Sequence, residues 1–237
     1  MKPGDYVVVK QGVRDPDFNS SIEAWQGRVI DLCENEDGST LLAIEWDSQT
    51  LSKIPEEVLL LSVRSGLDWA LMYLLEDEVQ ITKQRDTSKE VKQAQEKICE
   101  KEMKIIEEDG QKQLNIIAQV TQNREAEDLE MLERQLHDWR IYLEKNLSFP
   151  FEAEIIEPSI LDEEELKTLN VIGINDTNPG DGILVKALLD GKELLLPLSE
   201  LMPSDPKDPP YSAILAFHMW FDEEMDEEMD DDMEDEI

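Results

Sequence analysis

The spacing of apolar and polar positions divides the chain into segments with different periodicity. The N-terminal part contains short apolar, β-branched runs separated by turn residues, a pattern typical of β-strands. We expect strands at Tyr6–Lys10, Trp25–Ile30 and Leu41–Trp46, with a tight turn at Asp37-Gly38 before the third. Few helical signals accompany them, so this region is predicted to be a small β-barrel.

The middle of the chain has the periodicity of helices. No proline lies between Pro55 and Pro150, and Gly110 is the one glycine between Gly66 and Gly173. Thr87-Ser-Lys-Glu90 has the form of a capping box that begins a helix. Apolar residues then recur every three or four positions, at Val91, Ala94, Ile98 and Ile105 and later at Leu129, Leu132, Leu136, Trp139 and Leu143. This predicts two helices with a break near Gly110, as a hairpin or a bent pair, or one continuous helix through Gly110.

The C-terminal part returns to strand-like patterning. We expect strands at Phe151–Ile156, Val171–Ile174, Ile183–Leu189 and Glu193–Leu198, followed by an amphipathic helix at Tyr211–Phe221. Turn residues separate these segments, at 175–182 and at Asp190-Gly191.

Together these segments predict an α+β protein. It would consist of two small SH3-like β-barrels joined by a helical connector, with a disordered acidic C-terminal tail. The predicted boundaries are 1–81 for the first barrel, 82–146 for the connector, 147–221 for the second barrel and 222–237 for the tail. The N-terminal barrel resembles SH3-like and Tudor-like domains only in its strand lengths and its Gly-Asp entry.

Charge narrows the classes of function. The 237 residues include 57 acidic and 22 basic side chains, a formal net charge of −35. Such a surface disfavours binding to nucleic acids and to anionic membranes. The basic residues are concentrated in 82–146, where 12 of them nearly balance 15 acids. Excess negative charge therefore lies on the two predicted barrels and the tail.

Other features favour a reducing compartment. Cys33 and Cys99 are too few for a disulfide framework and do not form a CxxC motif. The first residues lack the apolar core of a signal peptide, and no apolar run reaches the length of a membrane span. We expect a cytoplasmic protein, whose oligomeric state the sequence leaves open.

The tail has the most regular local pattern. Four blocks of three acids and one apolar residue end at Met225, Met229, Met233 and Ile237. Such charge density repels itself, so we expect disorder in isolation. A solubilising role is favoured over non-selective cation capture and over docking to a partner as a helix.

The C-terminal region resembles the CcbP-type calcium-binding family of cyanobacteria. The resemblance rests on Leu147-Ser-Phe-Pro-Phe-Glu-Ala-Glu-Ile-Ile-Glu-Pro158, Gly182-Ile-Leu-Val-Lys186, Leu196-Pro-Leu-Ser-Glu-Leu201 and the closing Tyr211…Trp220-Phe221. It covers residues 147–221. It implies a compact, acidic, SH3-like domain that binds calcium through surface carboxylates and has no EF-hand.

Several acids of this region are candidate calcium ligands, because Ca²⁺ takes six to eight oxygen ligands from pliable loops. The segment 176–181 offers Asp176, Asn178 and Asp181 within one turn. Asp190, Glu193 and Glu200 are the other acids that could converge on it from neighbouring turns. The alternative is that Asp and Asn stand there because turns favour them.

A weaker candidate lies in the N-terminal region. Asp15, Asp17, Asn19 and Glu23 match the start of an EF-hand loop. Ser20 and Gln26 replace the glycine and the bidentate glutamate that such a loop requires, so a true EF-hand is disfavoured. An irregular calcium loop and an ordinary polar loop remain as interpretations.

The sequence predicts a calcium buffer or sensor rather than an enzyme. It has no phosphate-binding loop, dinucleotide fingerprint or nucleophile motif, and His137 is expected on a helix surface. Tyr6, Phe18, Trp25 and Trp46 are expected to form core rather than a ligand cage. The alternative function is a metal-independent interaction module that binds a basic protein partner.

Overall fold

The protein consists of two compact units, Met1–Glu108 and Asp109–Ile237. The computed structural model describes residues 1–34, 38–126, 128–156, 168–207 and 210–234. The predicted turn at Asp37-Gly38, the end of the motif at Pro158 and the tail residues 235–237 lie wholly or partly outside these ranges. None of the described helices is long and apolar enough to cross a bilayer.

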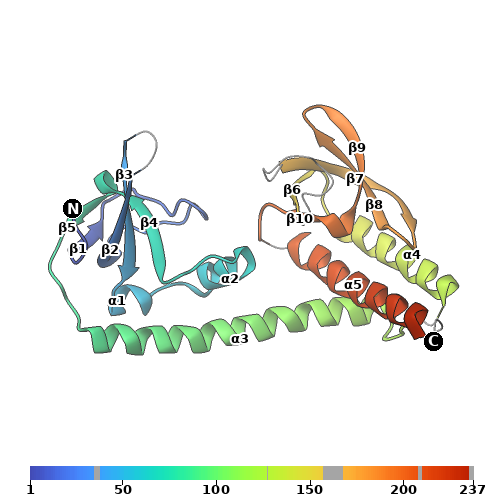
Figure 1. Ribbon diagram of the computed structural model, residues 1–237, viewed down its shortest axis with the longest axis horizontal. Helices are drawn as coiled ribbons and strands as arrows, with labels where there is room; N and C mark the ends of the chain where they lie inside the picture. Colours follow the sequence, from blue (N-terminus) through green and yellow to red (C-terminus); the bar gives the residue numbers. More distant parts are fainter. Residues whose placement is uncertain (35–37, 127, 157–167, 208–209, 235–237) are drawn as a thin grey trace. The chain divides into compact units, whose positions relative to one another are not determined.

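The first unit is built on a five-stranded antiparallel sheet in the order β4-β3-β2-β1-β5 (Figure 1). Its strands are β1 (Tyr6–Val9), β2 (Gln26–Glu34), β3 (Thr40–Trp46), β4 (Leu71–Leu75) and β5 (Val79–Ile81). The three predicted strands are confirmed. Their buried positions form the core, with Val7, Val29 and Leu42 completely enclosed.

Two helices of this unit are absent from the sequence-based prediction. α1 (Ser48–Leu51) begins after Asp47, whose side chain accepts a hydrogen bond from the Thr50 amide. α2 (Glu56–Ser65) has two acids in its first turn, and it ends at Gly66, which is left-handed. Leu51 and Leu59 from these helices are buried in the sheet's core, which is why a short barrel alone does not describe the unit.

A long helix, α3 (Ser88–Thr121), continues through Gly110. The break lies later, at Gln122 and Asn123, which both have positive φ angles. The predicted break at Gly110 is therefore wrong, and the alternative of an uninterrupted helix at that point is confirmed. The capping box is confirmed: the Thr87 amide donates to Glu90 Oε2 at 2.8 Å, and the Glu90 amide donates back to Thr87 Oγ1 at 3.4 Å.

The second unit has a sheet in the order β10-β6-β7-β8-β9. Its strands are β6 (Phe151–Ile155), β7 (Thr168–Asn178), β8 (Gly182–Leu189), β9 (Lys192–Pro197) and β10 (Leu201–Pro203). α4 (Leu129–Asn146) and α5 (Pro210–Glu234) lie side by side on this sheet (Figure 1). Leu132, Leu136, Trp139 and Leu143 of α4 are buried as predicted, whereas Leu129 is exposed.

The two sheets share one arrangement, in which the first strand lies between the second and the fifth. A short 3-10 turn precedes the fifth strand in each unit, η1 (Glu76–Glu78) and η3 (Leu198–Glu200). Among the described strands, no pairing joins the two edges of either sheet. The mixed α+β class is confirmed, but barrel closure is not.

The acidic tail differs from its prediction. Residues 222–234 continue α5 instead of being disordered. Glu224 holds the first turn beyond Phe221, because its carboxylate accepts hydrogen bonds from Trp220 Nε1 at 3.0 Å and from the Ala126 amide at 3.3 Å. No proline or glycine follows to end the helix.

Candidate calcium site

The acids of the predicted calcium loop lie in the hairpin between β7 and β8. The strands pair up to Asn178 and Gly182, with register shifts before Asp176. Asp181 donates its backbone amide to Asn178 Oδ1 at 2.8 Å, and Asn178 Nδ2 donates to Asp181 Oδ2 at 2.9 Å. Asp176 Oδ1 accepts the Thr177 amide at 2.9 Å. The structure thus brings Asn178 and Asp181 into direct contact, with Asp176 two positions before Asn178 on β7.

The hairpin is fixed to α5 at its base. Gly182 has a φ of +68°, and a Cβ at this position would lie 2.9 Å from the Phe221 ring. A larger residue would clash with Phe221 and strain the turn. The acids at 176–181 are therefore presented from a turn whose base packs on α5, just before Asp222.

Asp190 and Glu193 do not join this group. Asp190 and Gly191, with φ angles of 50° and 76°, form the turn between β8 and β9, at the opposite end of β8 from Gly182. Eight strand residues span roughly 25 Å. Glu193 also lies 3.8 Å from Lys186 Nζ. The expected convergence of these two acids on the hairpin is wrong, because antiparallel pairing places successive turns at alternate ends of a sheet.

Glu200 lies on η3, between β9 and β10. Its backbone carbonyl accepts a hydrogen bond from the Ile156 amide at 2.8 Å. Glu200 thus belongs to the connection that brings β10 back to β6.

The EF-hand-like segment is a compact polar loop between β1 and β2. Asp15 is buried, and its Oδ1 accepts the amides of Asp17 and Phe18 at 2.8 and 3.0 Å. Asn19 has a φ of 55°, and Glu23 is exposed. Burial raises the pKa of Asp17, and the nearby charge of Asp15 raises it further. Asp15 therefore holds its own loop together, as the ordinary-loop interpretation expects.

Across the described residues, no three His, Cys, Asp or Glu side chains are already placed to hold a metal. A calcium site at the hairpin must therefore draw on the Asn178 amide and backbone carbonyls, or gather its carboxylates as the ion binds. Both are ordinary for Ca²⁺, which accepts neutral oxygens and irregular geometry.

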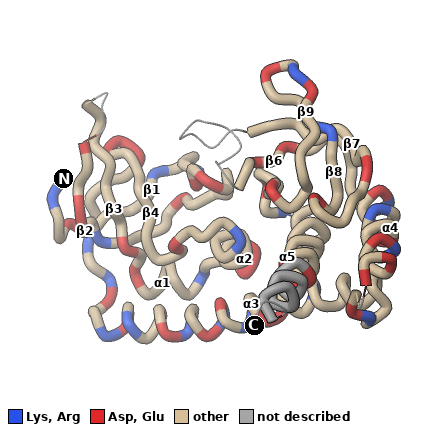
Figure 2. Tube along the Cα trace, turned by 45° about the vertical axis from the view of Figure 1, so that its right-hand side comes forward, with Lys and Arg blue, Asp and Glu red and all other residues tan. Residues whose placement is uncertain are grey.

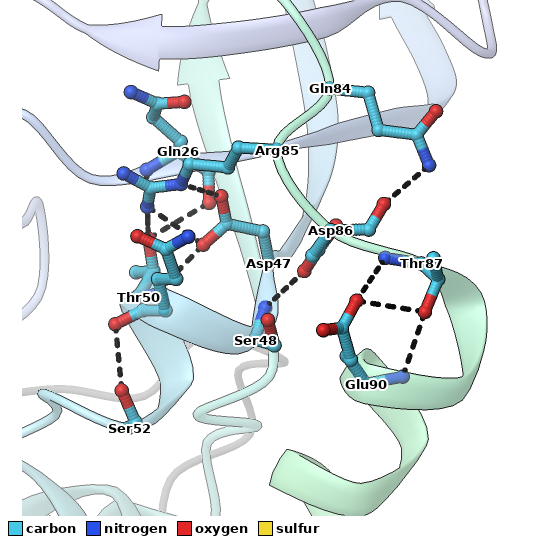
Figure 3. Close-up of polar contacts among 11 residues, drawn as sticks. Gln26, Asp47, Ser48, Thr50, Ser52, Gln84, Arg85, Asp86, Thr87 and Glu90 are labelled. Atoms are coloured by element: carbon cyan, nitrogen blue, oxygen red, sulfur yellow. Dashed lines mark hydrogen bonds and ion pairs between the residues drawn. The ribbon is translucent and has the colours of Figure 1, made fainter.

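Two polar groups that sequence reasoning did not find lie in the first unit. The buried Asp47 forms an ion pair with the partly exposed Arg85, 38 positions along the chain, and Asp86 Oδ2 accepts the Ser48 amide at 2.6 Å (Figure 3). In the second unit, the buried His218 ring is 2.9 Å from the Leu198 carbonyl. Long sequence separation hides the first two contacts from any local pattern.

Comparison with known proteins bears on the second unit. Residues 125–221 match the family model of CcbP, described as calcium binding. The matched region begins before residue 147, the predicted start of the resemblance, and so includes α4. No curated protein matches the chain.

Two solved structures are similar to part of the chain. One is a calcium-binding protein in its calcium-binding form, with 22% identity over 48% of this chain and 90% of that one, and a TM-score of 0.37. The other is Anabaena CcbP, with 24% identity over 40% and 77% and a TM-score of 0.32. The C-terminal region of this chain, residues 125–221, resembles the CcbP calcium-binding family, as its sequence predicted.

Proposed function

We propose that this protein binds calcium through its C-terminal unit and acts as a calcium buffer or sensor in the cytoplasm, without enzymatic activity. The observation that carries the proposal is the match of residues 125–221 to a calcium-binding family. The exposed, unbonded Cys33 and Cys99 are consistent with a reducing compartment. We also infer that both sheets are SH3-like, since they share a strand order and a 3-10 turn before the last strand.

We assign the tightest site to the β7–β8 hairpin. Asp176 and Asp181 supply carboxylates, and Asn178 supplies an amide oxygen. Calcium would displace the Asn178 Nδ2 hydrogen from Asp181 Oδ2, so one short internal contact is exchanged for ion ligation. The turn is fixed between two strands, so its ligands have already lost much of their conformational freedom on folding.

The hairpin is favoured over the tail as the tight site because its ligands, unlike the tail acids, cannot replace one another. Twelve acids between Asp222 and Glu236 are nearly interchangeable, so the loss of one is covered by its neighbours. In the hairpin the loss of one ligand has no replacement. The tail would then contribute weak, salt-sensitive binding, and the negative surroundings would raise the local cation concentration.

The packing of the hairpin favours sensing over buffering alone. Phe221 contacts the position of Gly182, and Trp220 next to it donates to Glu224. An ion that changes the turn would therefore alter the start of the acidic segment of α5. Tryptophan fluorescence of the full chain would report this change during a calcium titration.

The test is isothermal titration of the full chain with Ca²⁺ and with Mg²⁺. We expect saturable calcium binding, and we expect Asp176→Asn with Asp181→Asn to weaken the tightest site more than about tenfold. The matched control is Asp190→Asn with Glu193→Gln, which removes the same charge at the other end of β8. Asn tolerates the left-handed φ of position 190.

Three outcomes would reject parts of this proposal. Absence of saturable calcium binding up to millimolar concentration would reject the function. If deletion of residues 222–237 abolished the tight site while the hairpin variant retained it, the site assignment would be wrong. Equal loss in the hairpin variant and in the control would mean that only net charge matters.

A further inference from the structure

The first unit contains a pocket of about 390 Å³ between one face of its sheet and the beginning of α3. Tyr6, Arg28 and Glu45 lie opposite one another on β1, β2 and β3 and line it from the sheet. Val91 and Lys92 line it from α3, and Trp46 is buried against it. The volume is in the usual range of small-molecule sites.

The acids that line this pocket are already engaged. Asp47 binds Arg85, with Arg85 Nη2 donating to Asp47 Oδ1 at 2.8 Å (Figure 3). Asp86 accepts the Ser48 amide, as the same view shows. Gln95 Nε2 donates to Glu45 Oε1 at 3.4 Å. The acidic side chains of the pocket thus bind other groups of the first unit.

The cations are not engaged. In the parts of the chain that the structure describes, neither the Arg28 guanidinium nor the Lys92 ammonium has a hydrogen bond or ion pair. Arg28 has no ion pair with Glu45, although the two are cross-strand partners. Two uncommitted cations at one pocket stand out in a chain with a net charge of −35.

We propose that this pocket binds a small organic anion. Its carboxylate or phosphate would lie against Arg28 and Lys92, and its apolar part would pack on Tyr6 and Val91. Arg28 suits planar oxyanions because its guanidinium donates in a fixed fork. The Trp46 Nε1 also has no hydrogen-bond partner among the described residues, and could accommodate an acceptor on the ligand after a small adjustment.

A cationic ligand fits this pocket less well. A cage for a methylated amine needs open aromatic faces. Trp46 is only 1% exposed and packs edge-to-face on Trp25 at 5.3 Å. Trp46 belongs to the core and Trp25 packs against it, as predicted, whereas the prediction is not confirmed for the partly buried Tyr6 and Phe18. Calcium is equally disfavoured, because Asp47 is ion-paired with Arg85 and the cations Arg28 and Lys92 line the pocket.

The net charge of the protein does not oppose this binding. Charges farther than about 8 Å are largely screened at physiological salt. The charges next to the ligand would therefore decide the local potential. α3 supplies a nearly balanced mixture of Lys and Glu along its length (Figure 2). All of the lining residues precede Glu108, so this inference is independent of the calcium function proposed for the second unit.

The test is calorimetric titration of the full chain with three anions: benzoate, phenyl phosphate and inorganic phosphate. Chelator is present throughout, so that calcium plays no part. We expect saturable binding of at least one phenyl-bearing anion at millimolar or lower concentration, and weaker binding of inorganic phosphate. Benzoate and phenyl phosphate distinguish a carboxylate ligand from a phosphate ligand.

Variants locate the site. Arg28→Gln with Lys92→Gln should weaken binding at least about tenfold. Lys53→Gln with Lys83→Gln removes the same charge from the same unit outside the pocket, and should change affinity less than about twofold. Glu45→Gln should tighten anion binding, because it removes a neighbouring negative charge. Urea unfolding of each variant checks that the first unit remains folded.

Three results would overturn the proposal. One is no saturable binding of any probe up to about 10 mM. Another is equal loss in the pocket and control pairs. The third is tighter binding of benzylammonium than of benzoate, which would make the pocket a cation site.

Discussion

At the residue scale, the partly buried ion pair of Asp47 and Arg85 links the beginning of α1 to the segment before α3. Burial alone would raise the pKa of Asp47, but hydrogen bonds from Arg85 and from Thr50 outweigh it, and the pKa is lowered overall. The pair stabilises the first unit in its ionised form. Since the folded-state pKa is below the unfolded one, this contribution is present above about pH 4 and disappears as the pH falls through the folded pKa.

We therefore expect Asp47→Asn to lower the free energy of unfolding of the first unit by about 1–3 kcal/mol at neutral pH. Asn at this position still caps α1, so the lowered free energy of unfolding measures the lost charge and not a lost helix cap. Urea unfolding at pH 7 and pH 3 measures it, and the difference from wild type should shrink at pH 3. The exposed Glu23→Gln is the control. A difference that is the same at both pH values would contradict the assignment.

In contrast to Asp47, which is stabilised in its charged form, His218 is held in its neutral form in the folded protein. Burial lowers its pKa, against the weaker effects of the Leu198 carbonyl and of Asp222, which raise it. The unfolded chain binds this proton at about pH 6.5. Because the unfolded state then holds more protons than the folded state, His218 makes the second unit less stable as the pH falls below that value.

His218→Gln tests this directly, since Gln keeps an N–H donor for Leu198 but does not titrate. We expect the stability of the wild type relative to the variant to decrease between pH 7.5 and pH 5.5. Thermal unfolding of both proteins at several pH values measures their stabilities. Because both carry the same 57 acids, the difference between the two stabilities leaves the contribution of His218. A pH-independent difference would show that the ring is not neutral in the folded state.

At the scale of elements, periodicity predicted strands and long helices well, because one face of each is buried. The stripe Leu132–Leu143 and the capping box at Thr87 are examples. The sequence also carries a signal for α2: Pro55 stands before two acids, and Gly66 follows its last residue. α1 is a single turn after Asp47 and is too short for periodicity. Pairing between distant strands, which decides where Asp190 lies relative to Asp181, leaves no local trace.

Gly110 provides a test of α3. It lies within the helix, and a Cβ at this position would meet no atom within 4 Å. Gly110→Ala should therefore stabilise the protein by about 0.5–1 kcal/mol, by reducing the freedom of the unfolded chain. The contrasting variant is Gly66→Ala, whose φ of 64° makes an alanine strained, and it should destabilise. Chemical denaturation followed by circular dichroism measures both. Destabilisation by Gly110→Ala would mean that α3 is interrupted there.

At the scale of the whole molecule, the charge is unevenly distributed. Lys alternates with Asp and Glu on α3 (Figure 2). In the sequence, the 16 residues from 222 carry twelve acids and no base. The field around the chain thus attracts cations generally, whichever residues ligate calcium. Selective ligation and general attraction respond differently to salt.

We expect the calcium affinity of the full chain to fall several-fold between about 50 and 500 mM NaCl. In the chain without residues 222–237, the tight site should persist and its salt dependence should be smaller. Thermal unfolding with Ca²⁺, Mg²⁺ and chelator is the companion measurement, because a selective ion raises the midpoint through preferential binding to the folded state. Equal shifts with both ions would indicate screening alone.

The pairing of each first strand with its last strand has a consequence for synthesis on the ribosome. Val7 pairs with Ile81, and Ala153 pairs with Pro203, so each sheet is completed across about 70 and 50 residues. A chain that emerges from its N-terminus can complete the first sheet while α3 is still being made. The second sheet has no fifth strand until Pro203 has emerged, and Phe217 and Trp220 of its core come later still. Until then the nascent second unit exposes the strand on which α5 will pack, so its folding must follow translation of the segment up to Phe221.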